Sequence, residues 1–274
     1  MAGRTPPSRS RPARVWLNPT GGASLDGEAV SGVLFDYGNT LVTFDRPEAA
    51  LAAAYVRIAA RLRAVGLEPP EPEILLRDVH DRVEAELAAH MRGASLEEID
   101  LVDAARRAYA DLGLQTDAAV LDEVLRLEQE AWWVGVSVDP QAIPTLDELR
   151  RRGVRVGLCS NAPYRVRSLH DQLTHFGLDA HLDSITFSGE IGWRKPSQRI
   201  FEAALVALGE PAQRTVMFGD SIADDVAGAH AAGMRAVLLR RDSRSIADET
   251  QTGATIAVNE LGEIVPLLFE YRRL

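Results

Sequence analysis

The sequence predicts an α/β protein: a doubly wound, Rossmann-like parallel sheet that carries an inserted all-helical domain. Two observations predict this fold. From residue 138 onward, short apolar runs alternate with helical stretches, which is typical of a parallel sheet covered by helices on both faces. The apolar run 33–35 stands apart from the others, because residues 47–137 show the helical spacing of three and four and no strand signal. We therefore expect an insertion into one domain rather than two domains in series.

The first thirty-one residues differ in composition from the rest of the chain. They are rich in arginine, proline, glycine and serine, and no apolar stretch of the kind found in secretory signals follows the basic start. Such a composition predicts a disordered tail over residues 1–31. The sheet domain is then expected over residues 32–46 and 138–274, with the helical domain over residues 47–137.

Each element follows from its local pattern of apolar residues and breakers. In the insert, glycine- and proline-containing breaks separate four predicted helices, at residues 49–65, 72–91, 96–112 and 118–133. In the sheet domain the predicted strands are 33–35, 154–159, 184–187, 215–218, 236–239 and 254–258. The helices between these strands are predicted at 144–152, 163–176, 196–208 and 222–232, and a last helix reaches the C-terminus.

Composition and charge exclude several classes of protein. The chain has 274 residues, 46% of them hydrophobic and 26% charged, as in soluble globular proteins. Its net charge of −10 argues against a nucleic-acid partner, and no apolar stretch approaches the roughly 18 residues of a membrane helix. The single cysteine, Cys159, cannot form an internal disulfide, which favours a reducing, cytoplasmic compartment.

Polar side chains gather where the predicted strands end. Asp36 follows the first strand, Ser160 and Asn161 follow the second, and Asp220 follows the fourth. Because ligands of doubly wound sheets bind outside the carboxyl ends of the strands, these residues are candidates for one site. Lys195, the only lysine in the chain, lies just after the third strand and joins this edge.

The chemistry of this set points to phosphoryl transfer. Clustered carboxylates repel one another unless a cation lies between them, and oxygen ligands suit Mg²⁺. A helix N-terminus at Ser160 and the ammonium group of Lys195 can both bind an anion. The sequence lacks the glycine-rich lysine loop of P-loop enzymes, so Asp36 is free to act as a nucleophile that forms an acyl phosphate.

Four segments resemble the motifs of the haloacid dehalogenase-like hydrolase superfamily, and they occur in the same order. These segments are VLFDYGNTL, GLCSNA, IGWRKPSQRIF and VMFGDSIADDVAGAHAAG, and the insert resembles the family's helical cap. The resemblance implies a Mg²⁺-dependent phosphatase of a small phosphorylated metabolite. The implied roles are nucleophile and metal ligand for Asp36, phosphate or substrate contacts for Ser160, Asn161 and Lys195, and metal-side ligands for Asp220, Asp225 and the backbone carbonyl of Gly38.

Gly38 is also the main departure from the family's pattern. Most phosphatases of this family have an aspartate there, two residues after the nucleophile, as general acid and base. Without it we expect slower turnover, because such help is worth roughly 10²–10⁴ in rate. Asp45 is a candidate replacement. Two further alternatives stay open: a catalytically degenerate member that binds a phosphorylated ligand or partner, and a 2-haloacid dehalogenase. The absence of lysine from the insert argues against phosphonate cleavage through a Schiff base.

Other residues have simpler interpretations. Asp224 is expected to favour a helix N-terminus rather than a metal. Cys159 is expected to be buried and inert, and the six scattered histidines do not have the spacing of metal ligands. Candidate specificity residues are Trp193, Arg46, His90, Arg92 and Arg165.

Overall fold

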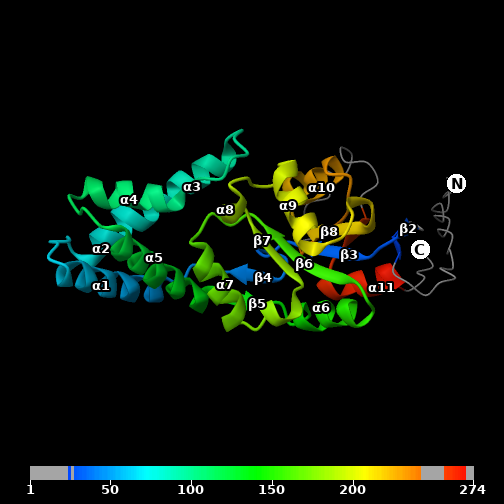
Figure 1. Ribbon diagram of the computed structural model, residues 1–274. Helices are drawn as coiled ribbons and strands as arrows, with labels where there is room; N and C mark the ends of the chain where they lie inside the picture. Colours follow the sequence, from blue (N-terminus) through cyan, green and yellow to red (C-terminus); the bar gives the residue numbers. More distant parts are fainter. Residues whose placement is uncertain (1–23, 26–27, 242–255, 270–274) are drawn as a thin grey trace, which may run out of the picture.

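The computed structural model describes residues 24–25, 28–241 and 256–269, and its sheet confirms the predicted fold class. Six parallel strands lie in the order β10-β9-β8-β3-β6-β7 (Figure 1). Their bounds are β3 (Gly32–Phe35), β6 (Arg155–Ser160), β7 (Ser184–Phe187), β8 (Thr215–Gly219), β9 (Arg235–Leu239) and β10 (Ile256–Val258). The first strand of the sheet domain thus lies between β6 and β8, the two strands that carry further polar residues at their ends.

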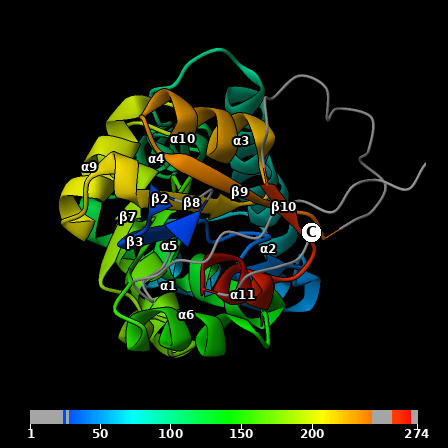
Figure 2. The same ribbon diagram turned by 90° about the vertical axis from the view of Figure 1, so that its right-hand side faces the viewer.

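Helices cover both faces of the sheet because successive residues of a strand point to opposite sides. On β3, Val33 and Phe35 pack in one cluster, and Leu34 packs in another. The first cluster includes residues of α6 (Ala142–Arg151), α7 (Val166–His175) and α11 (Ile264–Phe269), and the second includes residues of α9 (Gln198–Leu208) and α10 (Gly228–Ala231). Figure 2 shows α9 and α10 on one side of the strands and α6 and α11 on the other.

The insert is helical, as predicted, and lies at one end of the molecule (Figure 1). It consists of α1 (Glu48–Ala64), α2 (Pro72–Leu75), the π-helical η1 (Leu76–Asp81), α3 (Arg82–Arg92), α4 (Leu101–Asp111) and α5 (Ala118–Trp132). These helices share a hydrophobic cluster of their own, which includes Tyr55, Val79, Tyr109 and Val124. The separate cluster supports the domain division that we propose, with residues 47–137 as one unit.

One helix of the insert begins later than predicted. Leucine and isoleucine spacing predicted its start at residue 96, but α4 begins at Leu101. Asp100 caps it, because its carboxylate accepts a hydrogen bond from the Asp103 amide at 2.9 Å. The preceding residues pair with the sheet domain instead, as the bridge between Glu97 and Trp193 shows.

A short antiparallel ribbon that the sequence pattern did not predict joins the two parts. β4 (Val42–Phe44) pairs with β5 (Val136–Val138); β4 precedes the predicted insert, and β5 begins within its last two residues, where no strand is predicted. Each strand has three residues, and the partners are separated by almost the whole predicted insert, so no local turn signal marks them.

Of the predicted disordered tail, the structure describes residues 24–25 and 28–31, and for these residues the prediction is wrong. β1 (Ser24–Leu25) and β2 (Glu28–Ala29) form an antiparallel pair, and Leu25 and Val30 are buried against the sheet domain. The Arg235 guanidinium also donates to the carbonyls of Leu25, Glu28 and Ala29. Specific contacts therefore hold this segment, although its average composition is that of a flexible chain. The rest of the predicted tail and the start of the predicted strand 254–258 lie outside the described residues. None of the helices in the described ranges combines the length and the apolar character that crossing a bilayer requires.

Candidate active site

The carboxyl ends of three neighbouring strands bring the predicted site residues together. Phe35 of β3 pairs with Leu158 of β6 on one side and with Phe218 of β8 on the other. The residues that follow these positions therefore meet at one edge. Five predicted residues lie there: Asp36, Ser160, Lys195, Asp220 and Asp225.

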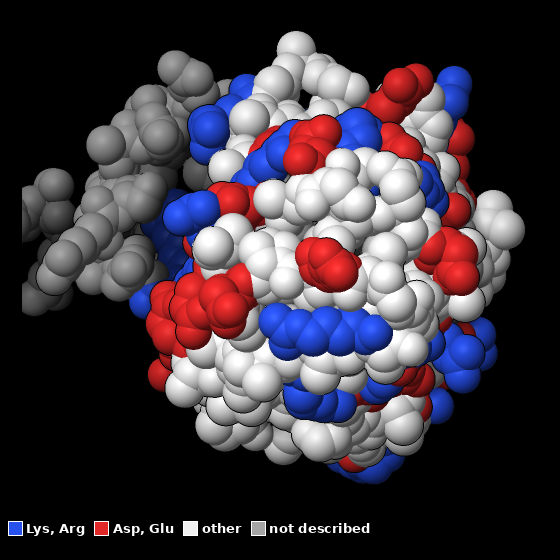
Figure 3. All heavy atoms as spheres, turned by 90° about the vertical axis from the view of Figure 1, so that its left-hand side faces the viewer, with Lys and Arg blue, Asp and Glu red and all other residues white. Residues whose placement is uncertain are grey.

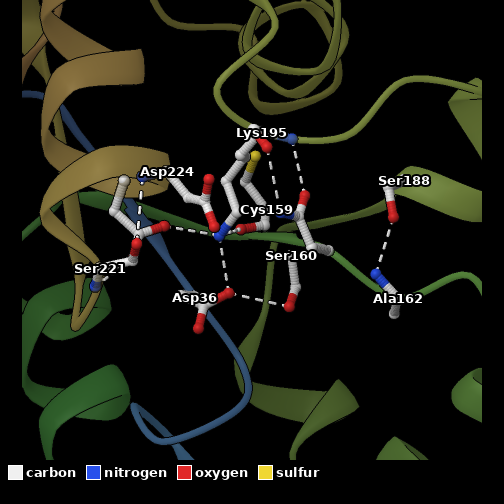
Figure 4. Close-up of polar contacts among 10 residues, drawn as sticks. Asp36, Cys159, Ser160, Ala162, Ser188, Lys195, Ser221 and Asp224 are labelled. Atoms are coloured by element: carbon white, nitrogen blue, oxygen red, sulfur yellow. Dashed lines mark hydrogen bonds and ion pairs between the residues drawn. The ribbon is translucent and has the colours of Figure 1, made fainter. Parts of the chain in front are cut away.

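Asp36 is held firmly in this edge. It is 8% exposed, and its amide donates to the carbonyl oxygen of Phe218 at 2.9 Å. Its Oδ1 accepts two hydrogen bonds, from Ser160 Oγ at 2.8 Å and from Lys195 Nζ at 2.7 Å (Figure 4). Its Oδ2 accepts no hydrogen bond from the described residues, so only one of the two carboxylate oxygens is anchored by them.

Lys195 connects the acidic groups of the site. Its ammonium group donates to Asp36, to Asp225 Oδ1 at 2.6 Å and to the carbonyl of Cys159 at 3.0 Å. Burial by itself would lower the pKa of Lys195, but the carboxylates of Asp225 and Asp36 outweigh burial and raise it above its ordinary value. The side chain therefore stays charged in a fully buried position.

The backbone around Lys195 is fixed by Asn161. The Asn161 Oδ1 accepts from the Lys195 amide at 2.7 Å, and the Asn161 Nδ2 donates to the Lys195 carbonyl at 3.2 Å. Asn161 also lines the adjoining pocket. Its amide group is engaged with the backbone of Lys195, so it positions the lysine as well as bordering the space where a substrate would lie.

Asp225 reaches the site from the π-helical segment η5 (Ile222–Ala227), which begins after Ser221. Its Oδ2 accepts from the Ser221 amide at 3.0 Å, and Ser221 Oγ accepts from the Asp224 amide at 3.1 Å. Gly219 makes this arrangement possible, since a Cβ at that position would lie 2.2 Å from Asp225 Oδ2. Gly219, which directly precedes Asp220, is not among the predicted site residues.

The carboxylates form a group that suits a divalent cation. Asp36, Asp220 and Asp225 each offer an oxygen, and these oxygens lie within 4.8 Å of one another. Burial raises the pKa of Asp225 to about 6 in spite of the opposing charge of Lys195, and burial together with the charge of Asp36 raises the pKa of Asp220. Carboxylates crowded in this way are relieved by a hard dication with oxygen ligands, so the donor set fits Mg²⁺. Asp224 is not part of the group, and it lies in the first turn after Ser221, as expected.

A pocket of about 430 Å³ adjoins the cluster of three carboxylates formed by Asp36, Asp220 and Asp225. Gly38 and Ser160 border it on the side of Asp36, and Arg46 is one of its lining residues. Gln129, Trp132 and Trp133 come from the end of the insert, so both parts of the molecule form its walls. No motif in the sequence marks these residues as neighbours.

Several other candidates lie away from this pocket. Asp45 is exposed and does not line it, which removes the support for a replacement acid at that position. His90, Arg92 and Arg165 do not line it either, and Arg165 instead pairs with Asp122. The Trp193 ring packs under the Arg199 guanidinium, 4.0 Å from the ring centre. Cys159 is buried as predicted, and burial raises the pKa of its thiol to about 12, so it is inert.

The model of the haloacid dehalogenase-like hydrolase family matches residues 30–233, which contain all of these site residues. The chain belongs to this family.

Relatives with assigned functions agree with the family match. A phosphatase of Mycobacterium tuberculosis is 36% identical over 152 residues, which cover 56% of this chain and 65% of the relative. A glyceraldehyde 3-phosphate phosphatase of Methanopyrus kandleri is 31% identical over 77% of this chain and 84% of its own length. Four of the curated relatives, at 31–36% identity, match this chain over only 45–65% of their own length. Among solved structures, a phosphatase of the same family from Thermococcus onnurineus has a TM-score of 0.59 at 23% identity, with 89% of this chain and 100% of that chain covered, which shows the shared fold.

Proposed function

We propose that this hydrolase is a Mg²⁺-dependent phosphatase that removes the phosphoryl group from a small metabolite through an aspartyl-phosphate on Asp36. The observation that carries the proposal is the meeting of three carboxylates with the buried ammonium group of Lys195. Relatives named as phosphatases of glyceraldehyde 3-phosphate, phosphoserine and phosphoglycolate support a small phosphorylated substrate.

In the first step, Asp36 is the nucleophile. Its Oδ2, which carries no hydrogen bond from the described residues, attacks the phosphorus atom while Oδ1 stays anchored by Ser160 and Lys195. The bond between phosphorus and the ester oxygen breaks, and its electron pair leaves with the alcohol oxygen. In the second step, water attacks the phosphorus of the aspartyl-phosphate, which releases inorganic phosphate and restores the carboxylate.

The surrounding groups position the phosphate and stabilise its charge. Ser160 and Lys195 donate toward Asp36 and would donate to the oxygens of a bound phosphoryl group as well. Asp36, Asp220, Asp225 and the carbonyl of Gly38 are the groups that we assign to the cation. When bound, Mg²⁺ would neutralise phosphoryl charge and the mutual repulsion of the carboxylates. We assign the helical insert the role of a cap, which limits the access of water to this edge.

Gly38 favours a second hypothesis for the function of this site. Without an acid at this position, the protein could bind a phosphorylated ligand or partner and release phosphate very slowly. The two hypotheses share the binding groups and differ in turnover. The cluster of three carboxylates favours a cation-dependent reaction over dehalogenation, because dehalogenation in this family proceeds without a metal.

The test is the release of phosphate from 4-nitrophenyl phosphate, with and without Mg²⁺. We expect Asp36→Asn to lose at least about 10³ in kcat, because the nucleophile is lost, and removal of Mg²⁺ by a chelator to have a similar effect. Asp45→Asn is the matched control, since Asp45 is exposed and outside the pocket, and it should keep the wild-type rate. Activity that survives Asp36→Asn, or that does not depend on the cation, would contradict the mechanism.

A further inference from the structure

We propose that the substrate is an aryl phosphate, a monoester in which a flat aromatic group carries the phosphate directly on a ring oxygen. This inference rests on the proposed phosphatase function and adds the chemical class of the group that leaves. Two independent features of the described residues support it: the walls of the pocket and the residue that lies between the pocket and Asp36.

Five of the fourteen described residues that line the pocket are aromatic: Tyr37, Phe44, Trp132, Trp133 and Tyr164. Tyr37 and Phe44 come from the sheet domain and from the ribbon, and their rings meet edge to face with centres 5.9 Å apart. Trp132 and Trp133 come from the end of the insert, and the Trp133 ring lies 4.7 Å from that of His175. Rings that neighbours hold in place can stack on or meet the edge of an aromatic guest at little cost in entropy. A volume of about 430 Å³ is enough for one or two fused rings.

The described residues give the pocket little positive charge for a second anionic group. Among the described residues that line it, Arg46 is the only charged one. Its guanidinium is already paired with Asp81 at 2.6 Å and with Glu48 at 3.0 Å. A carboxylate or a second phosphate on the substrate would have to compete with Asp81 and Glu48 for this guanidinium.

Two polar atoms of the wall residues lack a partner within the described part of the chain but are not exposed to the pocket. Gln129 Oε1 and Trp133 Nε1 are buried and have no hydrogen-bond partner among the described residues. Gln172, also in the wall, already accepts from the Tyr37 hydroxyl at 2.9 Å. A substituent on the ring therefore gains no hydrogen bond from the Gln129 and Trp133 atoms as they stand.

Gly38 restricts the leaving group. An aliphatic alkoxide must be protonated as it leaves, and Gly38 cannot supply that proton. A phenoxide, whose conjugate acid has a pKa of about 10 as in tyrosine, leaves without such help and takes its proton from water. A Cβ at Gly38 would lie 3.4 Å from the Phe44 ring, so the place of the missing acid faces an aromatic wall. Gly38 therefore has two effects: it provides no general acid, and it borders the aromatic side of the pocket, where a ring would bind.

Binding tests the recognition of the ring separately from its reactivity. Benzylphosphonate is phenyl phosphate with CH₂ in place of the ester oxygen, and 3,4-dihydroxybutylphosphonate makes the same replacement in glycerol 3-phosphate. By calorimetry with Mg²⁺ present, we expect wild type to bind benzylphosphonate at least about tenfold more tightly than 3,4-dihydroxybutylphosphonate, because binding removes the apolar ring from water. Trp132→Leu should reduce this ratio severalfold. Trp193→Leu, a matched change outside the pocket, should leave it unchanged.

Turnover tests the leaving group. Phenyl phosphate and benzyl phosphate carry the same ring, but only the first releases a phenoxide. We expect kcat/KM for phenyl phosphate to exceed that for benzyl phosphate by about 10² or more. Equal rates for these two esters, or equal binding of the two phosphonates, would overturn the substrate class while leaving the phosphatase function intact. Tight binding of benzylphosphonate without phosphate release from any ester would overturn the phosphatase function and the substrate class with it.

Discussion

At the scale of single residues, one oxygen organises the site. Asp36 Oδ1 receives hydrogen bonds from a hydroxyl and from an ammonium group that lie far apart in the chain. Lys195 shares its other bonds with Asp225 and with the backbone of β6, so moving any one of these groups disturbs the rest. The chain uses arginine for every other basic side chain, and a compact ammonium group fits between two carboxylates where a planar guanidinium would not.

Gly38→Asp should restore the general acid and base. A Cβ at this position meets only Phe44, at ordinary contact distances of 3.4 Å and more, so a side chain can enter without moving the backbone. We expect kcat/KM for benzyl phosphate to rise at least about tenfold and the rate for 4-nitrophenyl phosphate to change little, because only the poor leaving group needs a proton.

Gly38→Asn is the control for this change, since it adds nearly the same volume but no acid. Equal gains for good and poor leaving groups, or the same gain with asparagine, would show that Gly38 affects the rate through something other than a missing acid.

At the scale of elements, two of the connections between the insert and the sheet domain lie close to the site. One is the ribbon of β4 and β5. The other lies between α3 and α4, where the Arg194 guanidinium donates to the carbonyls of Met91, Gly93 and Ser95. Arg194 directly precedes Lys195. The segment that carries the lysine is thus fixed by the insert on one side and by Asn161 on the other.

Gly135→Ala tests the first of these connections. Gly135 lies where the ribbon meets the insert, and its carbonyl accepts from the Asp45 amide at 2.8 Å. A Cβ there would lie 1.8 Å from the Asp45 carbonyl oxygen, so the two chain segments would have to separate. We expect the free energy of unfolding, measured with urea, to fall by about 1–3 kcal/mol.

Val134→Ala serves as the control, because Val134 is 76% exposed and its loss should cost less than about 0.5 kcal/mol. A Gly135→Ala protein with the urea midpoint of wild type would mean that the close approach of these two backbones is unimportant for stability.

At the scale of the whole molecule, the sequence predicted what is encoded locally. Buried parallel strands appear as continuous apolar runs, and residues directly after those runs, such as Asp36 and Asp220, share an edge in any doubly wound sheet. The ribbon and the pocket wall could not be predicted in this way. Gln129 and Gln172 become neighbours only when the insert packs on the sheet domain, and neither local spacing nor composition records that contact.

The surface of the insert carries many charged side chains, whereas Arg46 is the only charged residue among the described residues that line the pocket. On the face shown in Figure 3, acidic and basic side chains are interspersed, and no continuous patch of one sign extends across it. Within the insert, Arg82 pairs with Asp111 and Arg107 pairs with Glu86. Exposed pairs of this kind contribute little to stability, so the insert depends on its own hydrophobic cluster for its fold.

The most direct measurement is to locate the phosphoryl group during turnover. The protein is mixed with 4-nitrophenyl phosphate and Mg²⁺, quenched in acid within one turnover, digested and mapped by mass spectrometry. The account predicts one phosphoryl group on the peptide that contains Asp36, in wild type and in Asp45→Asn, and none in Asp36→Asn. Phosphate release with no modified peptide, or with the group on a different residue, would contradict it.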